Sequence, residues 1–134
     1  MVGRRDLDER RRAFRLGLDA ETRAAWALRL RFHRILARRF RCSAGEIDLV
    51  AVRGRTLVFV EVKARASLEA AREAVTARSR ARILAAADLW VARNPFYADH
   101  DRRFDVIAVL PGRWPRRILD AFRADDLDLP RTRS

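Results

Sequence analysis

Two carboxylates and one ammonium group lie in two short apolar segments near the middle of the chain. If residues 57–63 (LVFVEVK) form a strand, its alternation places Phe59, Glu61 and Lys63 on one face. Glu61 and Lys63 are then neighbours about 7 Å apart along that strand. Asp48 belongs to the preceding apolar segment, residues 47–52. Lys63 is also the one lysine among 30 basic residues, so an ammonium group stands only at this position.

The spacing of the two segments predicts a β-hairpin that brings the carboxylates together. The segments 47–52 and 57–62 are rich in β-branched residues and are separated by Arg-Gly-Arg-Thr. With a two-residue loop, Gly54 takes the first position of a type II′ turn and residue 53 pairs with residue 56. Counting outward, Asp48 lies directly opposite Glu61 on the same face. A one-residue change in the loop would turn Asp48 to the other face.

This arrangement of charges suits the hydrolysis of a phosphodiester. Two adjacent carboxylates repel each other unless a positive group lies between them, and either Lys63 or a divalent cation could be that group. Two carboxylates, a backbone carbonyl, waters and a substrate phosphate are oxygen ligands that suit Mg²⁺ or Mn²⁺. A compact ammonium can approach an attacking water, and its pKa shifts on burial, unlike that of arginine. The alternative for Glu61 and Lys63 is a surface salt bridge on a half-exposed strand.

A third carboxylate interrupts the apolar face of the first predicted helix, residues 6–32. Apolar residues recur there at spacings of three and four, in a stripe that includes the glutamate: Phe14, Leu18, Glu21, Ala25, Leu28 and Phe32. Glu21 is therefore a candidate third ligand, and the alternative is an edge residue that extends to water. Glu46 and Asp105 flank strands and have weaker claims, and we expect Asp105 to form a surface ion pair with the arginines beside it.

The remaining elements predict an α/β fold with a mixed central sheet. Residues 34–41 favour an edge strand, followed by a turn at 42–45. Residues 67–93 favour helix, broken near 75–76, and residues 104–110 favour a strand buried on both faces. The helical segment would return the chain to a strand parallel to 57–62 by a right-handed crossover. We expect one domain over residues 1–112 and a tail over 113–134 that packs on it or extends from it, with a helical stretch at 118–124.

Length and composition exclude several classes of protein. The chain has 134 residues, one cysteine, 49% apolar residues and a net charge of +12. That is enough hydrophobic material for one core, so a disordered basic tail is excluded, and no apolar run is long enough to span a membrane. The single cysteine excludes an internal disulfide, and the charged N-terminal region does not resemble a signal peptide. We therefore expect a cytoplasmic protein, as a monomer or weak homodimer, with no membrane partner.

The positive charge is concentrated in the first third of the chain. Residues 1–41 contain 13 basic and 5 acidic residues, which predicts a face that binds the phosphate backbone of nucleic acid. The alternative is a solvated helix surface with no partner. We expect the nucleic acid to be DNA rather than RNA. We expect five arginines to make such contacts: Arg31, Arg34, Arg38, Arg65 and Arg80. We expect the three tryptophans, at 26, 90 and 114, to lie in the core rather than to stack on bases.

The motifs Gly45-Glu-Ile-Asp, Leu57-Val-Phe-Val-Glu-Val-Lys-Ala-Arg65 and Arg103-Phe-Asp-Val-Ile107 resemble the YraN family of small bacterial proteins. The spacing of Asp48, twelve residues and then Glu61-Val-Lys63 is similar to the active-site pattern of the PD-(D/E)XK nuclease superfamily. The resemblance implies a restriction-endonuclease-like αβββαβ core in which Asp48 and Glu61 bind the metal and Lys63 assists the nucleophile. It also matches Glu21 to a glutamate that resolvase-type members place beside the metal.

The chain departs from that superfamily pattern at three positions. Ile47 stands where proline is frequent, and Ala20 stands where a glycine usually precedes the helix glutamate. Ser79 stands where many members have lysine or glutamine on the following helix, and the arginines at 78, 80 and 82 are candidate substitutes.

These observations favour a Mg²⁺- or Mn²⁺-dependent endonuclease that acts on DNA, including branched repair or recombination intermediates. The first alternative is a nucleic-acid-binding module on the same fold without turnover. A second is an arginine-rich protein that binds structured RNA, which needs no carboxylate cluster. The Asp48, Glu61 and Lys63 trio favours the enzyme, because a binding module has no chemical need for it.

Overall fold

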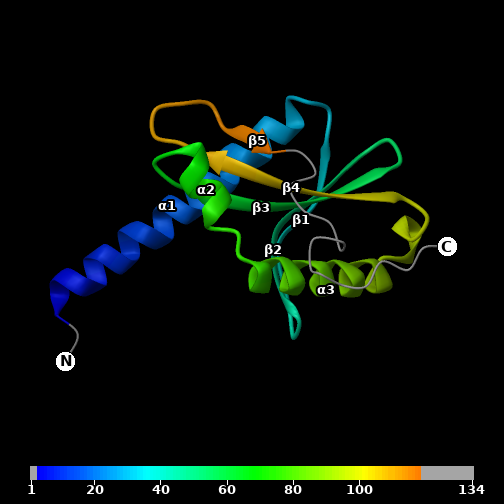
Figure 1. Ribbon diagram of the computed structural model, residues 1–134, viewed down its shortest axis with the longest axis horizontal. Helices are drawn as coiled ribbons and strands as arrows, with labels where there is room; N and C mark the ends of the chain where they lie inside the picture. The colour runs from blue at the N-terminus through cyan, green and yellow to red at the C-terminus, as the bar shows by residue number, and fades with distance from the viewer. Residues whose placement is uncertain (1–2, 119–134) are drawn as a thin grey trace.

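Five strands form one mixed sheet through the middle of the molecule, and helices cover both of its faces (Figure 1). The computed structural model describes residues 3–118, and for residues 12–18 only the backbone. The elements in chain order are α1 (Arg4–Arg29), β1 (Arg34–Cys42), β2 (Gly45–Arg53), β3 (Thr56–Ala64), α2 (Leu68–Glu73), α3 (Ala77–Arg93), the 3-10 turn η1 (Pro95–Tyr97), β4 (Asp101–Val109) and β5 (Arg116–Ile118).

The strand order confirms the predicted α/β fold with a mixed sheet. The strands follow one another across the sheet in the order β1-β2-β3-β4-β5. β1, β2 and β3 are antiparallel neighbours, β4 is parallel to β3, and β5 is antiparallel to β4. β1 is an edge strand, as predicted.

The fifth strand corrects one expectation about the end of the chain. Ile118, where a helical stretch was expected to begin, pairs with Val106 in β5. Its extended backbone supplies hydrogen-bond partners to β4, whose outer edge would otherwise be open. Residues 119–124 of the expected helix lie outside the described residues, as does the rest of the tail. The part of the tail at 116–118 belongs to the sheet.

The break predicted near residues 75–76 divides the helical segment into two capped helices. The Ser67 side chain accepts a hydrogen bond from the Ala70 backbone N–H at 3.1 Å at the start of α2. Thr76 caps α3 in the same way, accepting from the Ser79 N–H at 3.1 Å. Hydroxyl caps of this kind satisfy helix N–H groups that have no partner within the helix. None of the helices within residues 3–118 is long and apolar enough to cross a membrane.

The sheet separates two cores. Under α3, the larger core includes Leu57 and Phe59 of β3 with Trp90 of α3. Under α1, the second core joins Val58 and Val60 to the small residues of the helix. Alternate residues of β3 therefore face opposite helices, which is the alternation expected for this strand. Phe104 to Leu110 are all buried, as predicted for a strand covered on both sides.

The expected stripe on the first helix is correct only in its middle. Ala25 and Leu28 are fully buried, and Glu21 is 5% exposed. Phe32 lies beyond the helix, 83% exposed and with φ +66°. The Leu28 carbonyl accepts from the N–H groups of Arg31 and His33, which ends the helix and turns the chain into β1. The side chains of Phe14 and Leu18 lie outside the described residues.

The tryptophans correct a second expectation. Trp90 is buried in the core, 4% exposed, but Trp26 is 55% and Trp114 is 56% exposed. Trp26 lies on the outer side of α1, and Trp114 lies in the loop between β4 and β5. Two of the three rings therefore present large aromatic surfaces to solvent.

Candidate functional site

The predicted hairpin has the expected register over most of its length. Arg53 pairs with Thr56, and the pairing continues outward to Leu49 opposite Val60. Gly54 has φ +59°, as the first position of a type II′ turn requires. The loop therefore has two residues, and the hairpin prediction is confirmed.

The ladder ends just before the predicted carboxylate pair. The last paired position is Leu49 opposite Val60, so Asp48 and Glu61, expected directly opposite each other, are adjacent to the ladder rather than a pair within it. Asp48 Oδ2 instead accepts a hydrogen bond from the backbone N–H of Val62 at 2.8 Å. The Asp48 carboxylate thus joins β2 to Val62 of β3, the residue after Glu61. The two strands are joined there by a side chain rather than by main-chain groups.

An irregularity in β2 and β1 turns Asp48 toward β3. Ile47 and Val50 both pack in the core under α3, whereas Leu49 between them packs under α1. The alternation of β2 is therefore broken at residue 48. β1 has a matching irregularity at Arg39, which has φ +53° and lies across from Asp48 between two paired positions.

A glycine holds the start of β2 close to α3. A Cβ at Gly45 would lie 3.1 Å from both the carbonyl oxygen and the Cβ of Arg82. This close approach favours glycine at the first position of the Gly-Glu-Ile-Asp motif, because any side chain there would push against Arg82.

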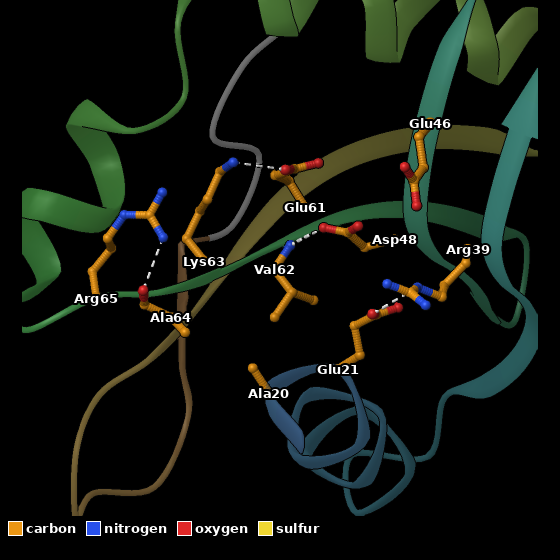
Figure 2. A pocket seen from close by; sticks show the side chains of 10 residues that line it. All are labelled: Ala20, Glu21, Arg39, Glu46, Asp48, Glu61, Val62, Lys63, Ala64 and Arg65. Atoms are coloured by element: carbon orange, nitrogen blue, oxygen red, sulfur yellow. Dashed lines mark hydrogen bonds and ion pairs between the residues drawn. The ribbon is translucent and has the colours of Figure 1, made fainter. Parts of the chain in front are cut away.

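The carboxylates open into one pocket of about 500 Å³, called here the carboxylate pocket (Figure 2). It combines four acidic with three basic side chains, and β1, β2, β3 and α1 all contribute. Its lining residues are Ala20, Glu21, Arg39, Glu46, Asp48, Glu61, Val62, Lys63, Ala64 and Arg65. The structure thus brings together all four residues of the predicted catalytic set.

Lys63 and Glu61 form an ion pair inside this pocket. Lys63 Nζ lies 2.9 Å from Glu61 Oε1, and the two side chains are only 19% and 14% exposed. The salt bridge that the alternative expected is therefore present, but it is largely buried in the pocket rather than on the surface. The ammonium is held within reach of the other groups in the pocket by a partner on its own strand.

Asp48 is the most strongly perturbed acid of the pocket. Burial, followed by the neighbouring Glu61 carboxylate, raises the pKa of Asp48 to about 7. The Val62 N–H and Lys63 oppose this rise without cancelling it. Near pH 7 the protonated and ionised forms of Asp48 are therefore both populated. A cation bound beside the carboxylate would favour the ionised form.

Glu21 is buried against Arg39 rather than extended to water. Its Oε2 lies 3.0 Å from Arg39 Nε, and its side chain is 7% exposed. Burial raises the pKa of Glu21, and Arg39 opposes the rise. Its second oxygen, Oε1, is buried without a hydrogen-bond partner among the described residues. The alternative of an edge residue that extends to water is wrong.

Arg39 is the residue of the pocket that the sequence did not single out. It is one of 29 arginines, and nothing in its neighbourhood distinguishes it. Its role depends on the irregularity that turns it toward Glu21, and no sequence signal marks that irregularity. Glu46, by contrast, lies at the exposed rim and pairs with Arg41 at 3.4 Å.

One of the five arginines expected to bind nucleic acid lines the pocket. Arg65 is exposed there and donates to its neighbour's carbonyl, Ala64 O, at 2.8 Å. Arg34 and Arg38 are exposed on β1, where they donate to the Tyr97 hydroxyl and to Thr22 Oγ1. Arg31 is exposed in the turn after α1, and Arg80 is partly buried in α3.

Asp105 corrects a further expectation. It is fully buried rather than on the surface, and Arg103 donates three hydrogen bonds to its two oxygens at 3.0 to 3.1 Å. The pairing with a neighbouring arginine is as expected, but it takes place under α1 because β4 is covered on both faces. Asp105 does not line the carboxylate pocket.

The donors of the pocket fit a hard divalent cation. Within residues 3–118, no three carboxylate, imidazole or thiol groups are gathered as a ready-made metal cage. Mg²⁺ does not require one, because it keeps several waters and binds through one or two carboxylates and substrate phosphates. Asp48 and Glu61 supply such a pair, and the unpartnered Glu21 Oε1 is a third oxygen in the same pocket.

Comparison with known proteins identifies the family of this chain, and the matched region contains the pocket. The profile described as "Uncharacterised protein family UPF0102" matches residues 20–109, which include all ten lining residues. A UPF0102 protein of Brucella canis is 53% identical over 120 residues, covering 89% of this chain and 95% of the relative. Another from Parvibaculum lavamentivorans is 52% identical over 111 residues, covering 83% of this chain and 84% of the relative. The chain therefore belongs to the UPF0102 family, which is the YraN family that its motifs resemble.

Proposed function

We propose that the protein is a Mg²⁺- or Mn²⁺-dependent nuclease that hydrolyses phosphodiester bonds in DNA. The observation that carries this proposal is the convergence of Asp48, Glu61 and Lys63 in one pocket, with the pKa of Asp48 raised by burial and then by its neighbour Glu61. Such perturbation by burial and a like charge is typical of functional sites. A protein that only binds a polyanion gains nothing from carboxylates at the binding surface.

Each residue has a role that follows from its position. Asp48 and Glu61 would hold the cation, and Glu21 would add an oxygen once its contact with Arg39 loosens. The bound ion would supply charge to the phosphoryl oxygens and lower the pKa of an attacking water. Lys63, held beside Glu61, orients that water or stabilises the charge that develops on the phosphate.

Arg65 extends the pocket toward the substrate. It is exposed at the rim, adjacent in sequence to the end of β3 and two residues after Lys63. A guanidinium binds phosphate through paired hydrogen bonds. Arg65 therefore supports binding of the backbone next to the phosphate that reacts.

A cleavage assay with matched variants tests the proposal. Linear and branched DNA is incubated with Mg²⁺ or Mn²⁺ and wild type, Lys63→Arg, Glu61→Gln or Asp48→Asn. Lys63→Arg keeps the charge but loses the compact donor, so cleavage should fall by about 10²-fold or more while DNA affinity remains. Glu61→Gln and Asp48→Asn should abolish metal-dependent cleavage.

The control is Glu73→Gln, which removes an exposed carboxylate from α2 outside the pocket and should cleave like wild type. Wild type without metal-dependent cleavage on any substrate would support the alternative of a binding module. Cleavage that survives all three pocket substitutions would show that the activity does not arise from this pocket.

A further inference from the structure

The two exposed tryptophans lie near a contact between α1 and the loop that joins β4 to β5. Four exposed residues at spacings of four, three and four form one row along α1 and its C-cap: Asp19, Arg23, Trp26 and Leu30. Arg23 Nη2 donates to the carbonyl of Arg113, the residue before Trp114. Through Arg23, the row therefore contacts the loop between β4 and β5 that carries the second exposed tryptophan.

Trp26 lies on the outermost line of α1, between two contacts of the helix with the sheet. Thr22, one turn before Trp26, accepts a hydrogen bond from Arg38 of β1 at 3.1 Å, and Arg23 contacts the loop between β4 and β5. Trp26 therefore lies between the side of the helix that meets β1 and the side that meets this loop. The surface formed by this row and residues 113–114 is called here the tryptophan surface.

A second pocket of about 500 Å³ lies between the Asp19 and Arg23 end of the tryptophan surface and the carboxylate pocket. The two pockets share Ala20, Ala64 and Arg65, so they are adjacent. Asp19, Arg23, Ala66 and residues 109–111 complete the second one. Its lining is mainly apolar with guanidinium groups of Arg23 and Arg65 at its sides, a combination that suits a base and sugar between two phosphates.

We propose that an unpaired strand of DNA lies across the tryptophan surface and enters the carboxylate pocket past Arg65. This inference rests on the proposed function and specifies its substrate as DNA with a single-stranded segment. Bases inside a duplex are stacked on each other, so aromatic side chains on an open surface stack only on unpaired bases. Two tryptophans on one surface provide two such platforms.

The charge of the surface favours a nucleic acid as the occupant. Arg29 lies over the Trp26 ring, with its guanidinium carbon 5.3 Å from the ring centroid. Arg23 and Arg113 are also exposed on this surface. Asp19 is the one acid of the row, and its carboxylate suits an amino or imino group of a base rather than a phosphate. Stacking faces beside guanidinium groups are the usual means of binding single strands without sequence preference.

Tryptophan fluorescence tests this inference without any cleavage. The full chain in EDTA is titrated with short oligothymidine and, separately, with a blunt duplex at equal phosphate concentration. Oligothymidine should quench the emission in a saturable way, and the duplex should quench it much less. Trp26→Ala and Trp114→Ala should each weaken oligothymidine binding roughly five- to hundredfold, the range for loss of one base–aromatic stack. Duplex binding should stay unchanged.

Phe96→Ala is the matched control. Phe96 is 77% exposed in η1, outside both pockets, so its removal should leave oligothymidine binding at the wild-type level. Thermal unfolding of each variant checks that it is folded, and Trp26→Phe should restore most of the affinity lost in Trp26→Ala.

Two outcomes would overturn the inference. Oligothymidine binding that is as tight in both alanine variants as in wild type would show that these tryptophans do not stack on unpaired bases. Equal quenching by duplex and oligothymidine would show no preference for unpaired bases. Because the assay contains no divalent metal, tryptophan-dependent binding without cleavage in the separate nuclease assay would contradict only the proposed function.

Discussion

Asp48 Oδ2 accepts a 2.8 Å hydrogen bond from the Val62 backbone N–H, in the place where the β2–β3 ladder would otherwise continue. The same carboxylate lines the pocket beside Glu61 and Lys63. One side chain therefore links the two strands and supplies the charge with the raised pKa. Comparing Asp48→Asn with Asp48→Ala separates the two roles, because the amide keeps the hydrogen-bond acceptor and removes the charge, whereas alanine removes both.

Below about pH 4, where Asp48 is protonated in both the folded and the unfolded chain, Asp48→Asn should be close to wild type in stability, because the amide oxygen still accepts from Val62. Asp48→Ala leaves that N–H without its partner and should lower the free energy of unfolding by about 1–3 kcal/mol. Urea unfolding measures the difference. Asp88→Ala, which removes an exposed acid on α3, is the control. Equal stability of the amide and alanine variants would contradict the bridging role.

Stability should also depend on pH through Asp48. Its pKa is raised from 3.8 to about 7 in the folded state, so the native protein keeps a proton that the unfolded chain has released. The resulting stabilisation is present below about pH 4 and is lost as the pH rises through about 7. The free energy of unfolding of wild type relative to Asp48→Asn should fall over this window by on the order of a few kcal/mol. A pH-independent difference between the two proteins would contradict the raised pKa.

The hairpin that carries the site could be predicted from sequence because its turn is local. Gly54 in a two-residue loop determines the register, and the burial of alternate residues of β3 follows from its pattern. The bridge from Asp48 could not be predicted, because it depends on the irregularities at Asp48 and Arg39 in two adjacent strands. The alternation of apolar and polar residues in the sequence shows neither irregularity.

The partner of the buried Glu21 and the exposure of Trp26 could not be predicted for a related reason. An apolar stripe indicates which side of α1 is buried, and it marks Glu21 as unusual. It does not indicate that Arg39 from another element compensates the carboxylate. Nor does it show that a large aromatic residue such as Trp26 is left outside, because the helix packs through alanines instead.

Arg39→Ala should destabilise the protein through Glu21. The substitution leaves a carboxylate that is 7% exposed without its cation, so the pKa of Glu21 should rise further. We expect the free energy of unfolding to fall by about 1–3 kcal/mol at neutral pH, and Glu21→Gln in the same chain to recover most of the loss. A double-mutant cycle measures the coupling.

The exposed Arg41–Glu46 pair provides the matched control for that cycle. Its side chains are 67% and 41% exposed, so Arg41→Ala should change stability by less than about 0.5 kcal/mol. Equal decreases in the free energy of unfolding for Arg39→Ala and Arg41→Ala would show that the buried Glu21–Arg39 pair contributes no more to stability than an exposed pair.

DNA binding should be electrostatic and should depend on Arg65. Affinity should decrease steeply with salt, and Arg65→Ala should weaken binding and reduce the slope of log affinity against log salt by about one. Arg55→Ala is the control, because Arg55 is in the hairpin loop at the other end of β3 and pairs with Asp99. Fluorescence anisotropy at several salt concentrations measures both. An identical slope for Arg65→Ala and wild type would exclude a phosphate contact at this residue.

The most direct test of the central claim is an anomalous-difference map from a crystal soaked in MnCl₂. The account predicts a peak in the carboxylate pocket with oxygens of Asp48 and Glu61 at about 2.0–2.3 Å, and no peak there in a crystal of Asp48→Asn treated in the same way. An empty pocket in the wild-type crystal, with Lys63 and Glu61 still paired and Mn²⁺ bound elsewhere, would contradict it.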